Sequence, residues 1–143
     1  MYNSSGQPVA FFSESADSDF ISLVKAWCQE NIIQELEMLA LLVAVEVWGP
    51  VWNGHRVVAF TDSESVRGEL SKTWSGNEPC HKLLTRLFAL EENHLCPIWL
   101  ERVPIQSNPS DPLSRSQVAK WMNLERSQVD FKTVWCHAIN GQG

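Results

Sequence analysis

The chain has 143 residues, of which 44% are hydrophobic and 20% are charged, and this fits one globular domain with a buried core. Its formal net charge of −6 excludes a protein that holds nucleic acid by charge alone, because phosphate contacts come from clustered Lys and Arg. The longest apolar run, residues 38–45, is too short to cross a bilayer, and the N-terminus has no signal-peptide pattern. We therefore expect an intracellular protein, cytoplasmic or nuclear, with no membrane association.

The first half of the chain predicts a hairpin followed by a helix. Residues 7–14 and 20–27 are apolar runs on either side of a polar turn, which is typical of two antiparallel strands. The apolar spacing becomes helical over residues 30–48, and Gly49 with Pro50 is the usual signal for a helix end.

The second half alternates strands with helices. Residues 56–62 and 96–104 predict strands. A short helix follows the first of them, capped by Ser63 or Ser65, and residues 78–92 have the apolar spacing of an amphipathic helix.

The end of the chain is harder to interpret. A last helix is expected to begin near Asp111 or Pro112, since proline suits a first helical turn. The pattern weakens beyond Gln117. We therefore expect an α/β domain over residues 1–116, a mixed sheet flanked by helices, and a tail of uncertain structure over residues 117–143.

The sequence gives little evidence for a disulfide, a zinc site or a catalytic cysteine or histidine. The four cysteines are widely spaced, with no CxxC pair and no zinc-finger spacing to histidine. We expect them to be reduced thiols. No serine, cysteine or histidine has the sequence context of a catalytic nucleophile and its base.

One acidic residue in the helix 30–48 has an unusual predicted position. At 100 degrees per residue, Glu35 and Glu46 fall on one side, which we assign to solvent. Glu37 falls almost opposite, in line with apolar residues, where a carboxylate needs hydrogen bonds, a cation or a metal. The alternative is that Glu37 lies near enough to the helix start to reach water.

Two further acids stand where a helix is about to begin. Asp62 follows a predicted buried strand and Asp111 precedes the predicted last helix. Each has an ordinary explanation as a turn former or helix cap. Together with Glu37, however, they could converge at one edge of the sheet, where carboxylate oxygens suit Mg²⁺ or Mn²⁺ and two such ions support phosphodiester cleavage.

Three motifs, in this order, resemble the RNase H domain that follows the reverse transcriptase of retroelements of the long-terminal-repeat and tyrosine-recombinase types. They are QELEMLALLVAVEVW, VVAFTDSESV and ERVPIQSNPSDPLSR, and the resemblance spans about residues 7–115. It implies an RNase H-like fold and hydrolysis of the RNA strand of RNA/DNA hybrids. It also implies two divalent metal ions held by Glu37, Asp62 and Asp111, and an upstream reverse transcriptase domain as a partner.

The resemblance also implies parts that this chain does not show. The family begins with a strand that carries its first catalytic aspartate, whereas residues 7–14 match the second strand of the family. A catalytic histidine before the last acid is also absent, and Gln106 is the nearest residue. Two interpretations therefore stay open: a nuclease that the missing strand completes, and a non-catalytic remnant that acts as a binding or structural module.

Overall fold

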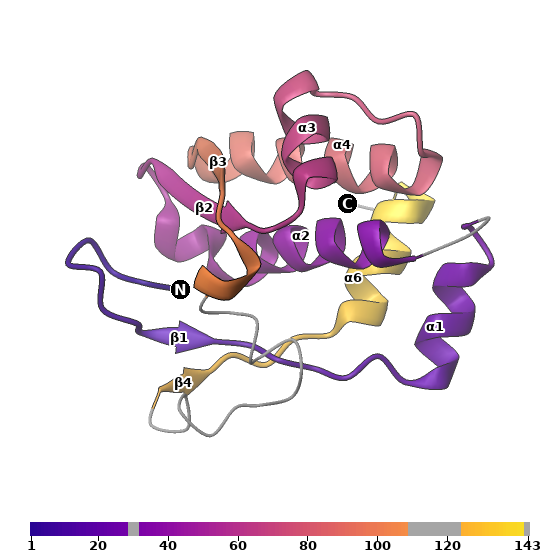
Figure 1. The fold of residues 1–143 in the computed structure, drawn as a ribbon, viewed down its shortest axis with the longest axis horizontal. Helices are drawn as coiled ribbons and strands as arrows, with labels where there is room; N and C mark the ends of the chain where they lie inside the picture. The colour runs from indigo at the N-terminus through magenta and orange to yellow at the C-terminus, as the bar shows by residue number, and fades with distance from the viewer. Residues whose placement is uncertain (29–31, 109–123, 142–143) are drawn as a thin grey trace.

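The computed structural model describes residues 1–28, 32–108 and 124–141. These residues form an α/β structure with five α-helices and four short strands (Figure 1). No helix among them is long and apolar enough to cross a membrane. In chain order the elements are β1 (Ala10–Phe11), α1 (Ser18–Lys25), α2 (Ile33–Trp52), β2 (Val57–Thr61), α3 (Glu64–Lys72), α4 (Glu78–His94), β3 (Ile98–Arg102), a 3₁₀ turn (Ile105–Ser107), β4 (Glu125–Arg126) and α6 (Phe131–Asn140).

The strands of the described residues form two small parallel sheets. β2 pairs with β3 over all five residues, and β1 pairs with β4 over two. This differs from the single mixed sheet that the sequence predicts. β1 is too short to pair further, and its partner comes from near the C-terminus.

Helix α2 is the centre of the structure. It lies between α3 and α4 on one side and the N-terminal and C-terminal segments on the other (Figure 1). On the first side its Glu46 carboxylate accepts two hydrogen bonds from Arg86 of α4, at 3.0 and 3.2 Å. On the second side the Trp48 indole donates to Ser127 Oγ at 3.0 Å.

The predicted end of this helix at Gly49 and Pro50 is wrong, because α2 continues to Trp52. Proline in a helix interior removes one backbone hydrogen bond, so packing must stabilise this last turn. Gly49 is buried, and a Cβ atom built on it would lie 2.5 Å from Cδ2 of His94. Here the glycine allows close contact between α2 and α4.

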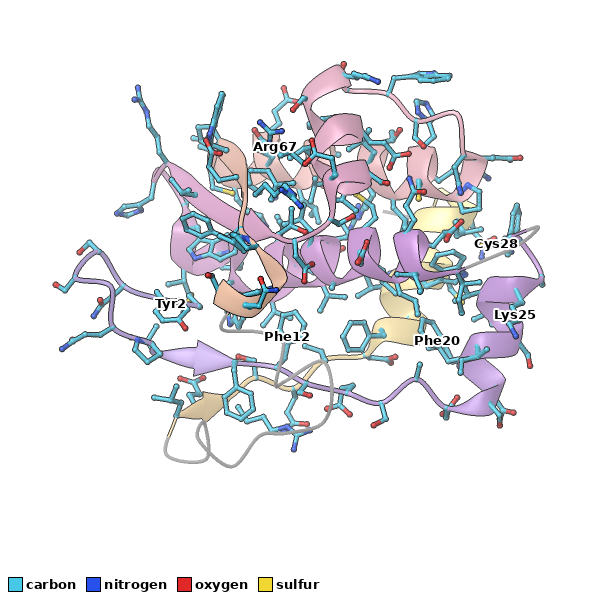
Figure 2. All side chains as sticks on the ribbon, viewed as in Figure 1. Tyr2, Phe12, Phe20, Lys25, Cys28 and Arg67 are labelled. Carbon is cyan, nitrogen blue, oxygen red and sulfur yellow. The ribbon has the colours of Figure 1, made fainter. Side chains whose placement is uncertain are left out.

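Residues 20–27, predicted as a strand, belong to helix α1 and the residues after it. Asp17 caps this helix, because its carboxylate accepts a hydrogen bond from the Phe20 N–H at 2.7 Å. Phe20 and Val24 are both buried and lie four residues apart, on one face of the helix. In Figure 2 the Phe20 side chain points from α1 toward the middle of the molecule. The predicted hairpin is therefore replaced by a strand and a helix.

The middle of the chain agrees with its predicted elements. β2, α4 and β3 lie within two residues of the expected ranges, and α3 follows β2 as expected. Ser63, one of the two residues predicted to cap this helix, is the N-cap of α3. Its side chain accepts a hydrogen bond from the Val66 N–H. α4 supplies four fully buried residues to the core, namely Cys80, Leu83, Leu84 and Leu87.

Helix α6 was not predicted. It lies in the tail of uncertain structure and packs against α2 and α4. Its Trp135 is one of the largest fully buried side chains of the described residues. Asp130 caps it by accepting hydrogen bonds from the Thr133 hydroxyl and the Thr133 N–H, and these hydrogen bonds lower the Asp130 pKa. The predicted last helix near Asp111 lies outside the described residues.

Candidate functional site

Asp62 lies where the sequence places it, directly after the last residue of β2. Ser63, and not Asp62, caps the following helix, so the ordinary role as a helix cap is already filled. The Asp62 side chain is partly exposed. In the described part of the chain no hydrogen bond or ion pair engages its carboxylate, which leaves its oxygens available to a ligand.

Glu37 lies in the second turn of α2 and is also partly exposed. It shares its side of the helix with Leu41, Ala44 and Trp48, which are partly buried rather than core residues. No hydrogen bond or ion pair to the Glu37 carboxylate is found among the described residues. Glu37 thus has the free oxygens of a potential ligand and is partly exposed, which agrees with the alternative that it lies near enough to the helix start to reach water.

The third predicted ligand, Asp111, lies outside the described residues. Across residues 1–28, 32–108 and 124–141, no group of three or more His, Cys, Asp and Glu side chains could hold a metal ion. The described residues therefore contribute two candidate ligands, Glu37 and Asp62, and no complete site. Oxygen donors of this kind still fit the chemistry of Mg²⁺ or Mn²⁺.

The assignment of Glu35 to the solvent side of α2 is wrong, because its side chain is only 2% exposed. The physical reason is that α2 is apolar on most of its circumference, so the position of its acids does not identify the exposed side. Glu35 shares a row with four buried residues at helical spacing, namely Met38, Leu42, Val45 and Gly49. The two ends of this row lie against α4, because Glu35 accepts from its N-cap residue Asn77 and Gly49 lies beside His94.

Glu35 belongs to a partly buried polar cluster between α2, α3 and the loop that joins α3 to α4. The Asn77 amide donates a 2.6 Å hydrogen bond to Glu35 Oε1, and the Gln34 amide donates at 2.7 Å to Glu69 Oε1. Ser75 also donates to Glu69. The second oxygen of each carboxylate is buried and has no hydrogen-bond partner among the described residues. We call Gln34, Glu35, Glu69, Ser75 and Asn77 the polar cluster.

Two thiols lie close to the polar cluster. Burial raises the pKa of Cys28 to about 12, with a further contribution from the charge of Glu35 and a hydrogen bond to it. Burial also raises the pKa of Cys80, and the nearby carboxylates of Glu69 and Glu35 add to this effect. Both thiols are therefore protonated at neutral pH and unsuited to nucleophilic chemistry.

Cys28 should consequently react slowly with alkylating reagents. At pH 8 a thiol of pKa about 12 holds about a thousandfold less thiolate than one with the ordinary value of 9.0. We expect iodoacetamide to modify Cys28 more slowly than free cysteine by a comparable factor, as followed by mass spectrometry. Glu35→Gln should speed the reaction because it removes the neighbouring charge. Modification at the rate of free cysteine would contradict the placement of Cys28 beside Glu35.

The polar cluster was missed by sequence reasoning, although one signal was present. Asn77 precedes Glu78 and Pro79, and this order is typical of a helix N-terminus, with the asparagine as its cap. In the structure Asn77 Oδ1 does accept a hydrogen bond from the Cys80 N–H at 3.0 Å. Nothing in the sequence, however, indicates that the amide nitrogen of the same side chain reaches Glu35, 42 residues away.

Comparison with known proteins finds no relative of this chain. No family model matches the chain. No curated protein and no solved structure matches it either. The family resemblance therefore depends on the three sequence motifs, and the fold on the α/β arrangement described above.

Proposed function

We propose that the chain is a retroelement-type RNase H-like domain that hydrolyses the RNA strand of RNA/DNA hybrids with the help of divalent metal ions. The observation that carries the proposal is the position of Asp62. It follows the carboxyl end of β2, which pairs in parallel with β3, and ligand sites of α/β proteins collect at this end of parallel strands. Its carboxylate is partly exposed and not engaged by the described residues.

In this proposal Glu37, Asp62 and Asp111 hold two ions, Mg²⁺ or Mn²⁺. Carboxylate oxygens are the ligands that these ions prefer. When bound, such ions activate a water molecule and stabilise the leaving oxygen of the phosphodiester. The role of this chain is to position Asp62 at the end of β2 and Glu37 on α2, while the first-strand aspartate of the family would come from another segment or another chain.

The first test replaces Asp62 with asparagine, which keeps the size of the side chain and removes its charge. We expect weaker binding of Mn²⁺, measured by calorimetry and by NMR signals around residue 62, and a loss of hybrid cleavage of more than about a hundredfold, since even indirect metal contacts contribute 10 to 100-fold. Glu37→Gln should act in the same direction.

Glu64→Gln is the matched control, because Glu64 lies two residues from Asp62 but points to solvent and pairs with Arg67 and Arg102. This variant should bind and cleave like the native chain. Saturable metal binding that is unchanged in Asp62→Asn would place the ions elsewhere and refute the proposed site. A folded chain with neither metal binding nor cleavage would identify a non-catalytic RNase H-like module.

A further inference from the structure

Strand β2 has one edge that no other strand of the described residues covers. The Val57 N–H donates to the Pro97 carbonyl, and the Val103 N–H donates to the Thr61 carbonyl. In a parallel pair, alternate residues of a strand face its partner, so the backbone groups of Val58 and Phe60 point away from β3. The sheet has only the two strands β2 and β3 in the described residues. Two N–H and two C=O groups thus form an edge that is free of partners among residues 1–28, 32–108 and 124–141.

The side chains along this edge are apolar and exposed. Val58 is 56% and Phe60 61% exposed, and Trp99, the β3 residue that pairs with Val58, is 67% exposed. The alternate residues of β2 face the core, where Ala59 packs against the buried cluster. An apolar edge strand with free backbone groups is a template for pairing with another strand. The chemistry of this edge therefore indicates an extended strand as its partner.

The charges at the two ends of β2 indicate which strand fits. Arg56 immediately precedes the strand and Asp62 immediately follows it, each three residues from Ala59. In the described part of the chain, neither side chain makes an ion pair. If a second β2 runs antiparallel with Ala59 opposite Ala59, each Arg56 stands beside the Asp62 of the other strand. The segment is thus complementary in charge to itself.

We propose that two copies of this chain associate through an antiparallel pairing of their β2 strands, centred on Ala59. In this register Val58 lies opposite Phe60 of the second copy, and these are the residues whose backbone groups point outward. Each such pair can exchange two hydrogen bonds, which gives four across the interface. The arrangement has twofold symmetry, the commonest symmetry of protein dimers.

The side chains support the same register. Valine beside an aromatic residue is a favourable cross-strand pair, and it occurs twice in the dimer. Ala59 meets its own copy at the symmetry axis, in a position without hydrogen bonds where the strands approach most closely. Its small side chain permits that approach. Two exposed Arg56–Asp62 pairs then contribute more to register than to affinity.

The proposal does not depend on nuclease activity and is tested by the oligomeric state. In the dimer Asp62 pairs with Arg56 of the second copy, so dimerisation and metal binding at Asp62 are competing states. Sedimentation velocity of the native chain from 1 to 200 μM should show a reversible monomer–dimer equilibrium. Val58→Pro should abolish the dimer, because it removes an outward N–H that β3 does not use. Trp99→Ser is the matched control, since it removes an apolar side chain of the same face and leaves the β2 edge intact; its dimer should persist.

Exchange of the two charges tests the register. Arg56→Asp or Asp62→Arg alone should raise the dissociation constant of the dimer about tenfold, because two attractive pairs become repulsive. The double variant with both substitutions should recover the affinity of the native chain. Failure of this recovery would overturn the antiparallel register. A native chain that stays monomeric at 200 μM would overturn the proposal.

Hydrogen exchange of the native chain tests the interface without any substitution, so misfolding of a variant cannot affect the result. Hydrogen exchange of the Val58 and Phe60 amides should slow as the concentration rises, because pairing engages both groups. The Val57 amide is already bonded to Pro97 and should exchange at the same rate at all concentrations. A dimer that leaves Val58 and Phe60 exchange unchanged would place the interface elsewhere and refute the proposal.

Discussion

Replacing Asn77 with alanine is expected to lower the free energy of unfolding by about 2 to 5 kcal/mol. The substitution removes two contacts at once. The amide nitrogen donates to the buried Glu35 carboxylate at 2.6 Å, and hydrogen bonds to charged groups contribute about 1.5 to 3 kcal/mol. The amide oxygen caps α4, and a lost cap costs about 0.5 to 2 kcal/mol. Urea denaturation followed by circular dichroism measures the effect.

Asn77→Ser separates the two contributions. Serine is a good N-cap but its short side chain cannot reach Glu35, so this variant should lose the Glu35 contact alone. We expect a stability between those of the native chain and Asn77→Ala, with about 1 kcal/mol recovered over alanine. A serine variant as stable as the native chain would mean that the Glu35 contact adds nothing, and that water or Cys28 satisfies the buried carboxylate.

Replacing Gly49 with alanine is expected to destabilise the chain by about 1 to 3 kcal/mol, the usual cost of an overpacked core. In an exposed helix the same change would stabilise by up to about 1 kcal/mol, because alanine is the better helix former. Here the new methyl group would lie 2.5 Å from the His94 ring, so either that ring or α2 must move. Thermal or urea unfolding of the purified variant measures the loss.

The cause is tested by repeating the substitution in a His94→Ala background. Without the imidazole ring the methyl group has room, so Gly49→Ala should then cost nothing or stabilise slightly. The difference between the two backgrounds measures the coupling between residues 49 and 94. Equal losses in both backgrounds would show that the His94 contact is not responsible. Gly68→Ala, in helix α3, is a control, because a Cβ there meets no atom within 4 Å.

The elements that sequence analysis predicted well are those whose signals are local. β2 ends at Thr61, and the Ser63 hydroxyl caps the N-terminus of the next helix. The helix from Glu78 has both a cap and a regular apolar face. In each case neighbours within four residues decide the structure, so a pattern along the chain is sufficient.

The elements that it missed depend on distant contacts. Residues 20–27 have an apolar run that suits strand or helix, and burial of Phe20 and Val24 in the core favours the helix, which the local Asp17 cap begins. Gly49 and Pro50 are helix stop signals in isolation, yet both lie within α2, where Gly49 is buried beside His94 of α4. Trp135 becomes a core residue because α6 returns to pack on α2 and α4.

The candidate site shows the same contrast between residues placed by local sequence and residues placed by distant contacts. The position of Asp62 after a strand follows from local sequence and is found in the structure. The distinction between Glu35 and Glu37 required knowledge of what surrounds α2, because a helix covered on several sides has no single solvent face. That Glu35 has a hydrogen-bond partner in the loop before α4 could be known only from the structure.

The contacts of Lys82 have a consequence for how the chain folds and unfolds. Its ammonium group donates to the Ile139 carbonyl of α6 at 2.9 Å and lies 5.0 Å from the centre of the Trp27 ring, just after α1. One side chain in the middle of the sequence therefore connects segments near both ends. Contacts between residues so distant in sequence slow folding, because long loops must close first. They also couple the two ends of the chain: when α6 detaches, Lys82 loses the Ile139 hydrogen bond and keeps its 3.9 Å pair with Glu78, so its position over Trp27 is less restrained.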